Sequence, residues 1–138
     1  MTFSLDPRLA ADTFPVGDLA LCRVLLMNDS RFPWLILVPR RADLSEIFDL
    51  AASERAVLIE EAARAAEKLK ALAGADKINI GALGNAVAQL HVHLVARRAG
   101  DAAWPGPVWG AGQASPYEAE AAATLVDHLR RALELRAI

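Results

Sequence analysis

Cysteine is nearly absent from this chain of 138 residues, which has only Cys22. A single thiol cannot form an intrachain disulfide, so the chain suits a reducing compartment rather than a disulfide-stapled secreted domain. No apolar run approaches the roughly 18–20 residues that span a bilayer, and the N-terminus lacks the basic segment of a secretory signal. These absences predict a cytoplasmic protein with no membrane partner.

An excess of charge of either sign is also missing. Fifteen basic and seventeen acidic residues give a formal net charge of −2 at pH 7, which argues against a nucleic-acid partner. Because 54% of the residues are hydrophobic, the chain can bury a core and is not expected to be disordered. A length of 138 residues suits one core of ordinary size, so we expect a single domain over residues 1–138.

Two apolar runs of strand length, residues 19–27 and 34–38, are separated by Asn, Asp, Ser and Pro. Such residues are typical of turns, so the pair predicts an antiparallel hairpin. The preceding segment contains Pro7 and Pro15. We expect an extended arm or a short strand near residues 3–5, followed by a loop.

Two helices are expected, one central and one C-terminal. Apolar residues recur at helical spacing between Ser53, the expected N-cap, and Gly74, the expected C-terminal glycine. Residues 115–118 read Ser-Pro-Tyr-Glu, a capping box with proline in the first turn. They predict the start of a helix that runs toward Leu135.

Further strands are expected near residues 77–82 and 89–97, where apolar and polar residues alternate. Strands and helices follow one another irregularly, with a hairpin early in the chain. This order favours the α+β class, with an antiparallel sheet of about five strands, one long central helix and a C-terminal helix.

The strand at residues 89–97 carries the pattern most relevant to chemistry. Alternate side chains of a strand point to opposite faces, so Gln89, His91 and His93 are expected on one face. The apolar residues between them are expected on the other face, in the core. Two of the chain's three histidines therefore share one face with an amide.

Three interpretations of this face compete. In the first interpretation, it is a solvated face of the sheet. In the second, it is half of a metal site that needs one or two further ligands. In the third interpretation, a neutral imidazole attacks an electrophilic phosphorus and forms a covalent intermediate. The nucleophile's other ring nitrogen must then be held by an acceptor, so that the correct tautomer faces the substrate.

Residues 84–96 resemble the motif of the histidine triad (HIT) family, in which three histidines alternate with apolar residues after a loop of the form Gly-Gln-x-Val-x. Gly84, Val87 and both histidines match this motif, which places Gln89 where the family has its first histidine. If His91 were taken as the first histidine instead, Gly84 and Val87 would lose their matches. The resemblance covers roughly residues 15–100.

The resemblance implies a role for each polar residue of this strand. His91 matches the family's central histidine, which is its nucleophile. His93 matches the third, which contacts phosphate or helps the leaving group depart. Gln89 is able to donate to a phosphoryl oxygen but cannot shuttle a proton near neutral pH. These three are the expected catalytic residues.

The resemblance also implies residues that bind the substrate. Asn79 and Asn85 match amide positions that contact phosphate. The family places a residue that binds the ribose just after the first hairpin strand, where this chain has Asn28 and Asp29. We predict Asn28 for that role, although turn formation explains both residue types equally well. This scheme requires no metal and no cofactor.

The function that the resemblance implies is a nucleotidyl hydrolase or transferase. It would act at the α-phosphate of a nucleoside phosphate ester, anhydride or phosphoramidate, through a covalent nucleotidyl-histidine. A purine nucleotide is the expected substrate, and a homodimer with joined sheets is the expected assembly. The alternative, motivated by Gln89, is a nucleotide-binding or scaffold protein of the same fold that has lost efficient turnover.

Overall fold

Five strands form one antiparallel sheet in the order β1-β2-β3-β5-β4. The computed structural model describes residues 2–138, so Met1, the first residue of the predicted domain, lies outside the described residues. The strands are β1 (Thr13–Asp18), β2 (Cys22–Met27), β3 (Trp34–Pro39), β4 (Lys77–Gly81) and β5 (Val92–Arg97).

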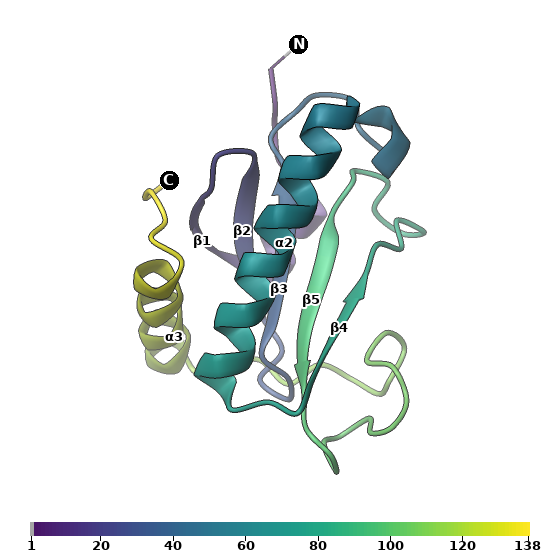
Figure 1. The fold of residues 1–138 in the computed structure, drawn as a ribbon. Coiled ribbons are helices and arrows are strands. Elements are labelled where there is room, and N and C mark those ends of the chain that lie inside the picture. The colour runs from purple at the N-terminus through teal and green to yellow at the C-terminus, as the bar shows by residue number, and fades with distance from the viewer. Residues whose placement is uncertain (1) are drawn as a thin grey trace.

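Helices lie on both faces of this sheet. The long helix α2 (Ala52–Ala73) crosses one face, and α3 (Ala119–Ala132) lies beside it (Figure 1). The short helix α1 (Pro7–Asp12) packs Leu9 into the apolar cluster of the opposite face. A single 3₁₀ turn, η1 (Ile47–Asp49), precedes α2. Within the described residues, no helix combines the length and apolarity that crossing a membrane requires.

The sheet is buried on both faces, which explains why the apolar run of β3 does not alternate with polar residues. Leu35 and Leu37 point into the cluster under α2. Ile36 and Val38 point into the second cluster, together with Leu9 of α1. All six residues of β3 are buried, as expected for a strand with a covered surface on each side.

The α+β class, the hairpin and the central helix are confirmed. β2 pairs antiparallel with β3, and Gly74 ends α2 in the left-handed conformation, with φ 60°. The expected N-cap of α2 is wrong, because the helix begins at Ala52 and Ser53 already lies inside it.

The first eighteen residues differ from the expected arm and loop. Pro7 occupies the first turn of α1, after Asp6, whose side chain accepts from the Arg8 N–H. Pro15 lies in the edge strand β1, beside a register irregularity that ends at Gly17. Proline is tolerated at such positions because its missing N–H is not needed there. The two prolines therefore mark a helix start and an edge strand rather than a loop.

The predicted C-terminal helix starts later than its capping box indicated. α3 begins at Ala119 and has no side-chain cap. Ser115 is bound instead to the loop after β2: its N–H donates to Asp29 Oδ1, and its carbonyl accepts from the Ser30 N–H. The segment between β5 and α3 is thereby attached to the face of the sheet opposite α2.

Candidate active site

The two histidines of the motif lie together at the start of β5. Their ring centroids are 4.9 Å apart, and each residue is only 6% exposed. β5 lies between β3 and β4 in the sheet, so neighbouring elements fix both rings. Because the two rings are close and buried, the hydrogen bonds of each ring determine which of its nitrogens carries the hydrogen.

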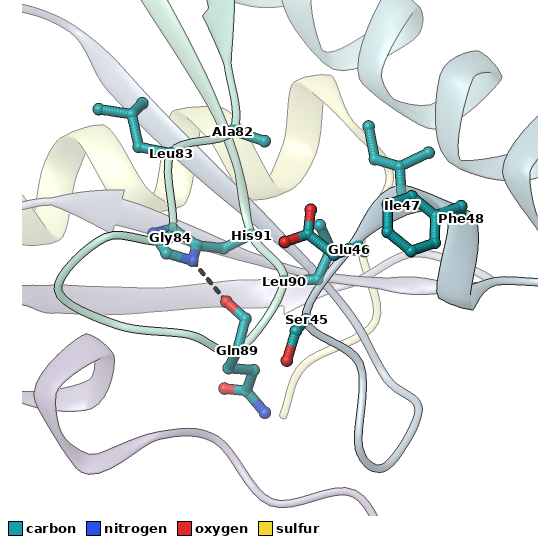
Figure 2. Close-up of a pocket in the computed structure, with 10 residues that line it drawn as sticks. All are labelled: Ser45, Glu46, Ile47, Phe48, Ala82, Leu83, Gly84, Gln89, Leu90 and His91. Carbon is teal, nitrogen blue, oxygen red and sulfur yellow. Dashed lines mark hydrogen bonds between the residues drawn. The ribbon is translucent and has the colours of Figure 1, made fainter.

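His91 is held by the main chain. Its Nδ1 lies 2.6 Å from the main-chain oxygen of Gln89 (Figure 2). A carbonyl oxygen only accepts, so Nδ1 carries the hydrogen and donates it. The lone pair of the neutral ring is therefore on Nε2, which is the arrangement that a nucleophilic or basic imidazole needs.

His93 has the opposite tautomer. Trp34 Nε1 donates to His93 Nδ1 over 3.0 Å, and an indole nitrogen only donates. The hydrogen of the neutral His93 ring is therefore on Nε2. Burial, with a smaller effect of His91, lowers the pKa of His93 to about 4. With both rings neutral, the pair presents one lone pair, on His91 Nε2, and one N–H donor, on His93 Nε2.

We expect His93 to make the fold sensitive to mild acid. Its pKa in the folded state is below the ordinary 6.5, so between about pH 6.5 and 4 the unfolded chain binds a proton that the folded chain does not. Stability then falls as the pH falls, by about 3 kcal/mol across this window. Denaturant unfolding at several pH values, on the wild type and His93→Gln, measures the difference.

The control for this measurement is His128→Gln, because His128 is exposed on α3. That variant should keep the wild-type dependence of stability on pH, whereas His93→Gln should flatten it. An equal slope in His93→Gln and the wild type would contradict the prediction.

Gln89, like His91, lies just before β5, which begins at Val92, so its place on the face of the two histidines stays a prediction. Its side chain bonds to the N-terminal segment: Nε2 donates to the Ser4 carbonyl over 2.9 Å, and Oε1 accepts from the Asp6 N–H over 2.8 Å. The residue thus connects the N-terminal segment to His91 by using both its side chain and its main chain.

Gln89→Ala is expected to release the N-terminal segment by removing both of these hydrogen bonds. The loss should be about 1–2 kcal/mol of stability, at about 0.5–1.5 kcal/mol for each bond. Hydrogen exchange of the Asp6 amide and a thermal melt measure it. Gln113→Ala, at an exposed position, is the control and should change neither. Unchanged protection of the Asp6 amide in Gln89→Ala would disprove this role.

The three asparagines expected to bind substrate lie at different places. Asn85 is exposed in the loop that leads to His91. Asn79, on β4, accepts from Arg97 Nη1 through its Oδ1. Asn28 follows β2, and its Oδ1 accepts from the Tyr117 N–H. Their contacts with a substrate stay predictions, and two of them have one side-chain atom engaged within the protein.

The sequence analysis did not predict which aromatic side chains contact His93. Trp34 donates to it, and Trp109 packs edge-on against it with centroids 5.5 Å apart. Trp109 also lies across Gly81, where an added Cβ would come within 3.0 Å of its ring. These contacts depend on the pairing of β3 with β5 and on a long loop, so no local pattern reveals them.

A pocket opens beside His91 (Figure 2). The segment around η1 forms one wall and the loop after β4 forms the other. Among residues 2–138, no three His, Cys, Asp or Glu side chains group closely enough to hold a metal ion. The residues lining the pocket are Ser45, Glu46, Ile47, Phe48, Ala82, Leu83, Gly84, Gln89, Leu90 and His91.

Solved structures of three bacterial histidine triad proteins are similar to this chain over nearly its whole length. The protein from Sinorhizobium meliloti 1021 is 54% identical, with a TM-score of 0.92, 94% of this chain covered and 96% of that chain. The Bradyrhizobium japonicum protein is 48% identical, with a TM-score of 0.93 and coverages of 96% and 99%. The Marinobacter aquaeolei VT8 protein is 46% identical, with a TM-score of 0.94 and coverages of 97% and 98%.

None of the curated proteins matches the chain. The HIT domain family matches residues 8–100, a range that contains the sheet, α2 and the two histidines. Together with the histidine geometry and the three similar structures, this match shows that the chain belongs to the HIT domain family.

Proposed function

We propose that this protein is a nucleotidyl hydrolase or transferase that uses His91 as its nucleophile. The observation that carries the proposal is the pair of opposite tautomers. His91 is held through Nδ1 by a main-chain carbonyl, so the lone pair of Nε2 is available. His93 is held through Nδ1 by Trp34, so its Nε2–H is available to donate to a phosphoryl oxygen.

In the first step, the lone pair of His91 Nε2 forms a bond to the α-phosphorus, and the bond from phosphorus to the leaving group breaks with its electron pair. The hydrogen stays on His91 Nδ1 and is donated to the Gln89 carbonyl, which stabilises the positive charge of the substituted ring. In the second step, water or another acceptor attacks the phosphorus, the N–P electron pair returns to Nε2, and the acceptor's proton passes to solvent.

The nucleoside is proposed to lie in a hollow lined by Met27, Trp34 and Trp109. Flat indole rings suit the face of a purine base, and the ion pair of Asp29 and Arg31 supplies polar groups at the wall. Both tryptophans also contact His93, so a nucleoside there would place its phosphate near the histidine pair.

We propose that the protein works as a homodimer. β4 is an edge strand, and an apolar groove lined by Leu58, Ile59 and Ile80 runs between it and α2. Ile59 and Ile80 are exposed, and an edge strand has unpaired backbone groups that a second sheet is able to continue. Sedimentation equilibrium should give twice the chain mass, and Ile80→Lys should shift it to the monomer.

Intact-protein mass spectrometry tests the proposed chemistry. The protein is mixed with nucleoside phosphoramidates, dinucleoside polyphosphates and aryl esters, and is quenched early at alkaline pH to preserve a phosphoramidate bond. We expect a mass increase equal to one nucleotidyl group, located on His91 by peptide mapping, together with free nucleotide. Metal chelation should change neither result.

The second candidate function is nucleotide binding without efficient turnover, and Gln89 favours it. In the proposed alignment Gln89 takes the place of the family's first histidine, and its amide is engaged by the N-terminal segment. A nucleotide-dependent rise in melting temperature, with neither adduct nor product from any substrate, would support this function and contradict the first.

A further inference from the structure

His93 differs from His91 in that another side chain fixes its proton. Trp34 is 6% exposed, and its N–H lies against His93 Nδ1 at 3.0 Å. An imidazolium would carry a hydrogen on Nδ1 as well, so two donors would face each other. A hydrogen bond to the neutral form disfavours the charged form, and burial acts in the same direction.

A neutral His93 is a poor proton donor for a leaving group, and the groups around it do not take over that role. Gln89 is an amide, and both ends of its side chain are bonded to the N-terminal segment. Glu46 lines the pocket beside His91, but it is exposed, and no side-chain hydrogen bond joins it to either histidine among residues 2–138.

We propose that Trp34 is a positioning residue that holds His93 as the Nε2–H tautomer, so that the site selects nucleotides whose leaving group departs as an anion. The inference rests on the proposed function. It narrows the substrate class to phosphoanhydrides and esters of acidic alcohols, and it makes phosphoramidates poor substrates.

The electron count of the first step explains this selection. When His91 Nε2 bonds to phosphorus, the breaking P–O bond of an anhydride or an aryl ester leaves its electron pair on an oxygen that is stable as an anion. His93 stabilises the phosphoryl oxygens with its N–H and keeps its proton. A breaking P–N bond would release an amide anion unless a proton arrived, and a positioned general acid contributes about 10²–10⁴-fold in rate.

The tautomer is measured first, without substrate, by ¹⁵N NMR of the ring nitrogens. The chain has three histidines, so single substitutions assign the signals. We expect His93 in the wild type to have the hydrogen on Nε2 alone, and we expect Trp34→Phe to give a mixture of tautomers. The matched control is Trp109→Phe: its ring also packs against His93, but its buried Nε1 has no hydrogen-bond partner among residues 2–138. It should leave the tautomer unchanged.

The leaving group is then tested with two AMP derivatives of the same size, the 4-nitrophenyl ester and the 4-nitroanilide. We expect the wild-type kcat/KM to be at least about 100-fold higher for the ester. In Trp34→Phe this ratio should fall at least about tenfold, because His93 becomes able to hold a proton on Nδ1. Trp109→Phe should keep the wild-type ratio, whatever its effect on both rates.

Each outcome decides the proposal. A wild-type His93 with its hydrogen on Nδ1 overturns it, even if Trp34→Phe does not fold. An unchanged ester-to-anilide ratio in a folded Trp34→Phe also overturns it. Rapid cleavage of the anilide that disappears in Glu46→Gln would make Glu46 the acid instead. If neither compound is cleaved, the proposed function and the substrate selection both fail, and the tautomer measurement alone decides the role of Trp34.

Discussion

His91→Ala is expected to lower kcat by at least about 10⁴-fold and to abolish the nucleotidyl adduct. Removing the nucleophile of a covalent mechanism leaves only the acceleration that binding and hydrogen-bond donors provide. The nucleotide should still bind, because His93, Trp34 and Trp109 remain in place. Rapid-quench kinetics with an AMP aryl ester measures the rate, and calorimetric titration with AMP measures the binding.

Two comparisons make this result specific. His128→Ala removes the exposed histidine of α3 and should have wild-type activity. His91→Gln keeps a side chain of similar length without a nucleophilic ring nitrogen, and it should be as inactive as His91→Ala. Residual turnover above about 1% of wild type in both His91 variants would mean that water attacks the phosphorus directly and that no covalent intermediate is needed.

The parts of this protein that the sequence predicted are those that local patterns determine. The spacing of His91 and His93 placed both rings at one strand, and they lie 4.9 Å apart. Gly74 ended the central helix, as its conformational freedom allows. The hairpin followed from two apolar runs and the turn residues between them. Each of these inferences needs only a few consecutive residues.

The parts that were missed depend on contacts between distant segments. The tautomer of His93 is fixed by Trp34, 59 residues earlier, through the pairing of β3 with β5. The side chain of Gln89 is engaged by Ser4, 85 residues earlier. Strand alternation also could not show that β5 begins only at Val92, so that Gln89 and His91 both precede it. A single sequence does not show which distant segments pair or in which register they do so.

Asp101→Ala is the variant that we expect to destabilise the fold most, by about 3–5 kcal/mol, because it leaves a buried charge without its partner. Arg97 is 1% exposed. Its Nε donates to Asp101 Oδ2 over 2.8 Å, and its Nη2 donates to Oδ1 over 2.9 Å. The Arg97 guanidinium holds the pKa of the Asp101 carboxyl well below its usual range. This stabilisation is present above about pH 4 and is lost as the pH falls further.

Denaturant unfolding at pH 7 compares this variant with Asp127→Ala, which breaks the exposed pair of Asp127 with Arg131 on α3. An exposed pair contributes about 0–1 kcal/mol, so the two aspartates should differ by at least about 2 kcal/mol. Arg97→Met combined with Asp101→Ala should cost less than the sum of the single changes, because the double variant leaves no buried charge. Additive losses would show that the two side chains act independently.

The Asp101 carboxylate also holds the loop that places Trp109 against His93, so its loss should affect turnover as well as stability. Asp101 Oδ1 also accepts from the main-chain N–H groups of Ala103 and Trp104, at the start of the loop that brings Trp109 to His93. Asp101→Ala should therefore increase hydrogen exchange along residues 101–110 and lower turnover even where the protein is fully folded. If turnover at low temperature stays at the wild-type value while stability falls, the loop does not need this anchor to keep Trp109 against His93. The ion pair would then stabilise the fold alone.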